Sequence, residues 1–189
     1  DWPAWRGPDA NGIAREARLP TSWSEDKNVA WKLAMPGKAG STPIVWKDKI
    51  FLTSSEGSDL ILMCVSTGGK ELWKRKIAKA VRLAIKYDEA NEASASPCTD
   101  GKHVFAFVGS GHLACFDFDG NEIWKFNVQD RYGEFKIQHG LHTCPLLHED
   151  RLYLALLHNG GNLVVALDKA SGQEAWKIDR ASDPKGESR

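Results

Sequence analysis

The sequence lacks an excess of charge of either sign, and it lacks long apolar runs. Its 25 lysine and arginine residues equal its 25 aspartate and glutamate residues in number. No basic stripe stands out, so nothing favours nucleic acid or an anionic membrane as a partner. No apolar run approaches the roughly 20 residues of a membrane-spanning helix. With 42% hydrophobic and 26% charged residues in 189, the composition is that of a globular domain.

Cysteine is also scarce. The four cysteines show no CxxC spacing and no adjacent pair, although their number permits two disulfides. Cys64 and Cys115 take the place in a repeated pattern that Ala166 takes in its third copy. This equivalence favours small buried core residues, and it leaves open whether any disulfide forms among Cys64, Cys98, Cys115 and Cys144.

What the sequence does contain is an internal repeat. Residues 62–73 (LMCVSTGGKELW), 113–124 (LACFDFDGNEIW) and 164–176 (VVALDKASGQEAW) each read as an apolar strand followed by a turn that has a glycine four residues before a tryptophan. The repeat's six marker residues are Gly69, Trp73, Gly120, Trp124, Gly172 and Trp176. The tryptophans are 51 and 52 residues apart, a period typical of stacked supersecondary units.

A second series of motifs runs in phase with the first. Thr42-Pro43, Ser96-Pro97 and Cys144-Pro145 each precede an apolar run, and proline is tolerated at the first residue of a strand. One unit therefore reads as four antiparallel strands in about 50 residues, which predicts a propeller blade. Residues 104–108 and 152–157 are apolar at every position, as expected of strands buried on both faces.

The outer strands repeat a Trp-Lys pair. A tryptophan can fill the wedge between diverging blades while its N–H finds a backbone carbonyl, and the lysine suits an exposed edge strand. The four pairs begin at Trp31, Trp73, Trp124 and Trp176. We predict an all-β fold with blades at 41–77, 94–128 and 142–180, an N-terminal segment 1–40 with an orphan outer strand at 28–33, and a polar tail 181–189, all in one propeller domain. The turn glycines are expected to have positive φ.

These motifs resemble the repeat of the pyrroloquinoline-quinone (PQQ) family of β-propellers. The resemblance rests on residues 166–172 (ALDKASG) with Trp176, on residues 2–8 (WPAWRGP), on Leu19-Pro20 and Trp23-Ser24, and on residues 40–43 (GSTP) with His139-Gly140. That family includes quinone-dependent alcohol dehydrogenases and the outer-membrane assembly lipoprotein propeller, which is not an enzyme. The opening residues are similar to those of secreted PQQ-like proteins of planctomycete-type bacteria.

The resemblance implies a propeller of seven or eight blades, of which this chain would supply about half. A missing C-terminal half would then complete the propeller. A complete four-bladed propeller with one irregular blade is the alternative. The chain begins at Asp1 without methionine or signal peptide, so we expect a processed or excised polypeptide with an extracytoplasmic location.

Family dehydrogenases hold the quinone against a disulfide between adjacent cysteines, with a bound Ca²⁺ and an aspartate base. This sequence has no adjacent cysteine pair and no CxxCH haem-attachment motif, and its Ca²⁺ ligands cannot be placed by motif. We therefore expect no cofactor and no catalytic residue, and predict a scaffold that binds a protein or small polar ligand. The alternative is a propeller domain of a quinone-dependent dehydrogenase or other enzyme whose cofactor residues, with PQQ and Ca²⁺, lie outside this chain.

The densest polar cluster, residues 130–144, lies in a connection between predicted blades, where propellers usually bind ligands. Arg131, His139 and His142 are the candidate ligand-binding residues, with the two histidines facing the channel mouth beside Arg131. His142 and Cys144 would share a strand face, so His139, His142 and Cys144 form a weaker candidate zinc site. Hydrogen-bonded loop structure is the simpler interpretation.

Two other segments allow a second interpretation. Residues 78–93 have helical spacing and predict a solvated helix or a docking surface. Trp2, Trp5 and Trp23 could stack on sugar rings, but packing into gaps on the outside of the fold is the favoured prediction.

Overall fold

The computed structural model describes residues 1–14, 19–81, 91–135, 141–158 and 161–180. These residues form three antiparallel sheets of four strands each, with one short helix. The first sheet contains β1 (Ile44–Trp46), β2 (Lys49–Glu56), β3 (Asp59–Ser66) and β4 (Glu71–Lys79). The second contains β5 (Cys98–Thr99), β6 (His103–Phe107), β7 (His112–Asp117) and β8 (Glu122–Asn127), followed by α1 (Val128–Tyr132). The third contains β9 (Leu146–His148), β10 (Arg151–His158), β11 (Gly161–Asp168) and β12 (Glu174–Asp179).

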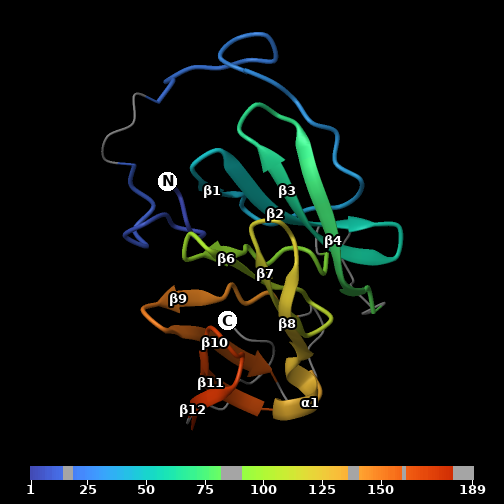
Figure 1. Cartoon of the computed structure of the whole chain (residues 1–189), viewed down its shortest axis with the longest axis vertical. Coiled ribbons are helices and arrows are strands. Elements are labelled where there is room, and N and C mark those ends of the chain that lie inside the picture. Colours follow the sequence, from blue (N-terminus) through green and yellow to red (C-terminus); the bar gives the residue numbers. More distant parts are fainter. Residues whose placement is uncertain (15–18, 82–90, 136–140, 159–160, 181–189) are drawn as a thin grey trace.

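Each sheet is a meander in which every strand pairs with its neighbour in the chain. The three sheets stack in chain order along the long axis of the molecule, and the N-terminal segment curves past the first sheet (Figure 1). Two apolar clusters fill the two gaps between sheets. One joins Phe51 and Leu62 to Val104 and Phe116, and the other joins Phe105 to residues of the third sheet. This is the all-β, partial-propeller architecture that the sequence predicted, and we call the sheets blades 1, 2 and 3.

The prediction that the inner strands are buried on both faces is correct for blades 1 and 2 only. All strand residues 104–107 of β6 are buried, and so are residues 60–65 of β3. In β10, buried residues alternate with partly exposed ones. The reason is that the described residues place a neighbouring blade against one face of blade 3 but none against the other, so the apolar residues of that other face stay accessible.

The repeated tryptophans join successive blades, as predicted. Each indole N–H donates to a backbone carbonyl in the turn before the outermost strand of the next blade along the chain. The pairs are Trp31 to Thr67 at 2.8 Å, Trp73 to Phe118 at 3.0 Å and Trp124 to Lys169 at 3.0 Å. The flanking repeats predict that Trp124 is largely buried between blades. It is only partly buried, because it lies at the outer edge of the interface, where its indole rests on the turn.

The turn glycines explain why a tryptophan fits there. Gly69, Gly120 and Gly172 have φ of +83°, +83° and +67°, so each lies in the left-handed region, as predicted. A Cβ built on Gly172 would lie 2.9 Å from the Trp124 ring. Glycine therefore serves both the backbone conformation of the turn and the close approach of the indole.

The orphan outer strand predicted at residues 28–33 is not formed. The only pairing near it is an isolated bridge between Ser24 and Lys27. A strand needs a partner for its N–H and C=O groups, and in the described residues no strand pairs with this segment. Trp31 nevertheless docks on the Gly69 turn, and Leu33 packs against the outer face of blade 1.

The prediction that the N-terminal tryptophans pack against the fold holds for one of the three. Trp2 forms an antiparallel bridge with Val45 and lies against Gly7. The prediction is wrong for Trp5 and Trp23, whose side chains are 56% and 69% exposed. Both lie in extended or turn backbone with no strand to hold them against a blade.

Two predictions cannot be compared with the structure. Most of the helix expected at residues 78–93 lies outside the described residues, because residues 82–90 are not described. The polar tail 181–189 is also outside them. Within the described part of the chain, no helix has the length and apolar character to span a membrane.

Candidate functional site

Three equivalent residues form a hydrogen-bonded series where the innermost strands begin. Each residue precedes the proline that leads into a blade, and we call Thr42, Ser96 and Cys144 the pre-proline ladder. The Thr42 backbone N–H donates to Ser96 Oγ at 2.8 Å, and the Ser96 N–H donates to Cys144 Sγ at 3.3 Å. The ladder thus crosses all three blades at one end of their inner strands and fixes their spacing there.

Further hydroxyl groups stiffen this end. Thr53, which is fully buried, donates from Oγ1 to the carbonyls of Ala93 and Ala95 at 3.0 and 3.1 Å. Ser41 Oγ accepts from the Thr53 backbone N–H at 3.0 Å. These bonds join blade 1 to the segment that enters blade 2, and they satisfy backbone groups that would be costly to bury unpaired.

Some of the predicted site residues lie at this end. His142, Thr143 and Cys144 are partly exposed and immediately precede Pro145 and β9. They are not part of a strand, so the expectation that His142 and Cys144 share a strand face is wrong: pairing with β10 begins only at Leu146. His139 lies outside the described residues. A ligand role for these side chains stays a prediction.

Arg131 has a structural environment that the sequence did not reveal. Its Nη1 donates to the Gly172 carbonyl at 2.7 Å, and its guanidinium lies 3.5 Å from the centre of the Phe126 ring. Arg75 makes the equivalent hydrogen bond one blade earlier, where its Nε donates to the Gly120 carbonyl at 2.7 Å. Both arginines therefore hold the glycine turn of the next blade, although Arg75 is on a strand and Arg131 on α1.

This contact places the guanidinium of Arg131 at the turn between β11 and β12. Gly172 lies in the β11–β12 turn, beside the β9–β10 turn, because the Lys169 N–H donates to the Asp150 carbonyl at 3.1 Å. His142 precedes β9 and is at the other end of the same blade. Arg131 contacts Gly172 and Phe126, and its place beside His142 at the channel mouth stays a prediction.

Sequence reasoning missed Glu92, a buried carboxyl near the pre-proline ladder. Its carbonyl accepts from the Gly109 N–H at 2.7 Å, and a Cβ on Gly109 would lie 3.0 Å from its Cα. Burial raises the pKa of the Glu92 carboxyl to about 7, and the backbone N–H of Val81 lowers it only in part. The sequence signal is weak, since a glutamate between small residues reads as loop.

The raised pKa predicts how stability depends on pH. Since the pKa of Glu92 is higher in the folded than in the unfolded protein, its contribution to stability is full below about pH 4.5 and is lost as pH rises through about 7. We expect the unfolding free energy of the wild type, relative to Glu92→Gln, to fall by up to about 1.4 kcal/mol per pH unit between pH 5 and 7. Urea melts at each pH measure this difference, and parallel pH profiles for the two proteins would contradict it.

The cysteines are free thiols in the structure. Cys64, Cys98 and Cys115 are buried, and burial raises the pKa of Cys64 and Cys115 to about 12 and that of Cys98 further still. A thiol with so high a pKa is almost entirely protonated at neutral pH and is therefore a poor nucleophile. All three lie in the core as small side chains, as the repeat predicted for Cys64 and Cys115.

Thiol titration tests this assignment. We expect an aromatic disulfide reagent at pH 8 to modify Cys144 in the folded protein, because it is partly exposed, and to reach all four cysteines only after denaturation. Cys144→Ser is the matched control and should abolish the reaction of the folded protein. Fewer than four thiols in denaturant, without added reductant, would reveal a disulfide and contradict the assignment.

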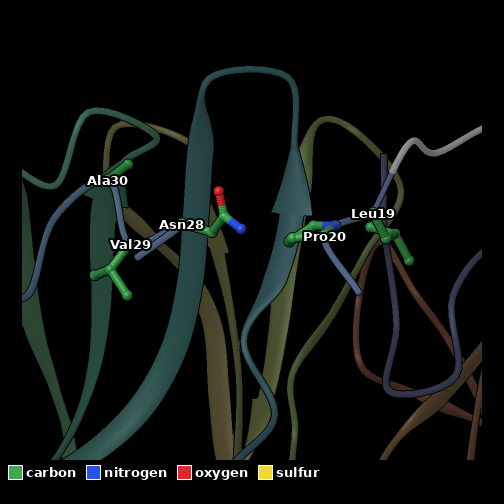
Figure 2. Close-up of a pocket in the computed structure, with 5 residues that line it drawn as sticks. All are labelled: Leu19, Pro20, Asn28, Val29 and Ala30. Atoms are coloured by element: carbon green, nitrogen blue, oxygen red, sulfur yellow. The ribbon is translucent and has the colours of Figure 1, made fainter. Parts of the chain in front are cut away.

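A shallow pocket lies on the N-terminal segment, at a distance along the chain from the residues above. Figure 2 shows Leu19 and Pro20 on one side of it and Val29 and Ala30 on the other, with the Asn28 amide between them. All five are exposed and none is charged. This pocket holds no group suited to acid–base or nucleophilic chemistry.

Comparison with known proteins agrees with the geometry. Residues 110–187 match the family model described as outer membrane protein assembly factor BamB, a model of PQQ-type repeats. This match covers the Trp124 and Trp176 repeats, whose turns carry Gly120 and Gly172. This part of the chain therefore resembles PQQ-type repeats, in agreement with its partial-propeller fold. No curated protein matches its sequence.

Solved structures of similar fold are quinone-dependent dehydrogenases. A quinohemoprotein alcohol dehydrogenase from Comamonas testosteroni superposes with a TM-score of 0.62 at 16% identity, over 82% of this chain and 23% of that one. A europium-containing methanol dehydrogenase superposes with a TM-score of 0.57 at 18% identity, over 79% of this chain and 26% of that one. A quinohemoprotein alcohol dehydrogenase from Pseudomonas putida HK5 superposes with a TM-score of 0.57 at 18% identity, over 82% of this chain and 22% of that one. The chain thus spans about a quarter of the length of these enzymes and has the fold of the part that it covers.

The described residues do not fit a quinone site of the dehydrogenase kind. Such a site uses a disulfide between adjacent cysteines, whereas the cysteines here are separate thiols, three of them buried in the core. Across the described parts of the chain, no three His, Cys, Asp or Glu side chains gather closely enough to hold a metal ion. The described repeats share the propeller fold of these enzymes, and whether the chain takes part in holding a cofactor stays a prediction.

Proposed function

We propose that the chain is a non-catalytic, extracytoplasmic propeller domain that binds a protein or a small polar ligand at the end of its inner strands. The pre-proline ladder carries this proposal. It holds three blades in fixed register and leaves polar side chains partly exposed around it, namely Thr42, His142 and Thr143. A rigid polar rim of this kind can present hydrogen-bonding groups to a partner without reorganising.

The family description supports a binding role. The matching model is named for an outer membrane protein assembly factor, and a factor that assembles other proteins has to bind them. The same description favours an extracytoplasmic location for this chain.

Site-specific photo-crosslinking tests the proposal. A photoreactive amino acid at Thr143, on the rim, should give a discrete adduct with a partner in extracts of the source cells. The same group at Asn121 is the control, because Asn121 is exposed in the β7–β8 turn at the opposite end of blade 2. Absence of an adduct from Thr143, or equal adducts from both positions, would contradict a binding site at the rim.

A quinone-dependent dehydrogenase remains the second candidate, because the similar solved structures are enzymes of that class. In this case, the cofactor-binding residues would lie outside the present chain. We expect no dye-linked alcohol oxidation after addition of PQQ and Ca²⁺ to the purified protein. Oxidation that disappears when either is withheld would overturn the non-catalytic proposal.

A further inference from the structure

One carboxyl group of the described residues is buried without a hydrogen-bond partner. Glu92 is 5% exposed, and neither its Oε1 nor its Oε2 is hydrogen-bonded. The backbone N–H of Val81 offsets part of the cost of burial, without reaching the length and angle of a hydrogen bond. Buried polar groups are almost always paired in native proteins, so this carboxyl needs a physical explanation.

Glu92 lies in residues 91–96, which lead into blade 2 and which we call the entry segment. The Glu92 carbonyl accepts from the Gly109 N–H of blade 2 at 2.7 Å. The next carbonyl, that of Ala93, accepts from Thr53 Oγ1 of blade 1 at 3.0 Å. Two consecutive residues of the entry segment are therefore hydrogen-bonded to two different blades.

The pre-proline ladder passes through the same segment. Ser96 Oγ accepts from the Thr42 N–H of blade 1, and the Ser96 N–H donates to Cys144 Sγ at the start of blade 3. The last residue of the entry segment thus links the other two blades. The common register of the three blades at this end depends on the entry segment staying in place.

The Glu92 carboxyl is held in its buried position by the packing of the aliphatic part of the side chain. A Cβ built on Gly109 would lie 3.0, 3.1 and 3.2 Å from the Cα, Cβ and Cγ of Glu92. Glycine at position 109 therefore makes room for Glu92 beside the β6–β7 turn, residues 108–111. While the side chain stays there, both carboxyl oxygens are kept from water.

No charge of the described residues compensates a Glu92 carboxylate. The entry segment and the β6–β7 turn contain no other titratable residue. The titratable residues that adjoin this turn and Val81 in sequence are His112, which is hydrogen-bonded to its own turn, and Lys79, which is exposed. Neither contributes to the shift of the Glu92 pKa, whose main cause is burial. The ionised form is therefore much more costly to bury here than the neutral acid.

We propose that Glu92 is a protonation switch for the pre-proline end: the entry segment stays docked between the blades while the carboxyl is neutral, and it is released when the carboxyl ionises. Release removes the acceptors of the Gly109 and Thr42 N–H groups. The ends of the inner strands then lose the hydrogen bonds that keep the blades in register.

The Glu92 pKa sets the direction of the switch. It is about 7 when the segment is docked, against an ordinary value of 4.5 when the carboxyl is exposed. Release is therefore favoured progressively as pH rises from about 4.5, and the effect is complete above about 7. The polar rim is most rigid in mildly acid solution. This consequence for binding rests on the proposed function, whereas the switch itself needs no partner.

Hydrogen exchange of single amides in the whole chain tests the switch. The Gly109 and Thr42 N–H groups report on the entry segment, and their exchange is measured by NMR at pH 6 and pH 8. The reference is Glu92→Gln, whose side chain is neutral at both pH values. Intrinsic exchange and the titration of His142 are common to both proteins, so the ratio of their rates isolates the effect of the carboxyl.

We expect the ratio of wild-type to Glu92→Gln rates at Gly109 and Thr42 to rise by about tenfold from pH 6 to pH 8, as the two pKa values require. The rates at pH 8 should not change in about 1 M urea, because release of a short segment exposes little surface. The matched control is Glu122→Gln, at an exposed carboxyl paired with Lys125, and its ratio to the wild type should stay constant.

A constant ratio for Glu92→Gln overturns the proposal. A ratio that rises together with a strong dependence on urea also overturns it, because the carboxyl would then act on global unfolding alone. If Glu92→Gln does not fold, Glu92→Met gives a neutral reference of similar length. Crosslinking at Thr143 tests the binding site without reference to Glu92, so failure of the switch and failure of the proposed function are distinguishable.

Discussion

Replacing Trp124 with alanine is expected to lower the free energy of unfolding by about 3 kcal/mol. The indole contacts Phe105 and Phe126, with ring centres 6.0 Å away in both cases, and it donates to the Lys169 carbonyl at 3.0 Å. Truncation therefore removes apolar contacts and leaves a carbonyl without its donor, and both losses fall on the interface between blades 2 and 3. Chemical denaturation followed by circular dichroism measures the change.

Trp176→Ala is the matched control, because Trp176 has the same place in the repeat but meets no following blade among the described residues. Its main ring contact is Tyr153 in its own blade, with centres 5.9 Å apart. We expect a loss below about 1 kcal/mol, typical of a partly exposed side chain. Equal losses at the two positions would show that the tryptophan stabilises its own blade and not the interface.

The repeat was sufficient to predict the fold because its signals are local. Each glycine turn, each proline-led strand and each tryptophan is defined within about 50 residues of sequence, and all agree on four antiparallel strands. The docking of Trp73 and Trp124 on backbone carbonyls followed from the size and the N–H group of the indole.

The candidate site was less predictable because it depends on contacts between blades. Arg131 is 41 residues from Gly172 in sequence, and its helix gives no sign that the side chain returns along Phe126. Thr42, Ser96 and Cys144 were visible as residues before proline, but their hydrogen bonds join positions 54 and 48 residues apart. The lack of a strand around Trp31 has the same origin, since strand formation requires a partner that local sequence does not specify.

Gly172→Ala is expected to cost about 3 kcal/mol, far more than a glycine-to-alanine change in an open turn. Two penalties combine: the left-handed conformation costs about 1 kcal/mol for alanine, and the new Cβ would lie 2.9 Å from the Trp124 ring, an overlap that costs about 2 kcal/mol more. The substitution Gly57→Ala measures the backbone penalty without the steric one. Gly57 also has positive φ, +59°, but a Cβ there meets nothing within 4 Å, so only the first penalty of about 1 kcal/mol should remain.

A double-mutant cycle with Trp124 locates the second penalty. If the methyl group of Gly172→Ala destabilises by displacing the indole, then the substitution should cost only about 1 kcal/mol in a Trp124→Ala background, because the ring is already gone. The coupling between the two positions would then be about 2 kcal/mol, while Gly57→Ala and Trp124→Ala, which do not touch, should be additive. Additivity at Gly172 as well would contradict the contact between turn and indole, and with it the account of how each PQQ-like blade holds the next.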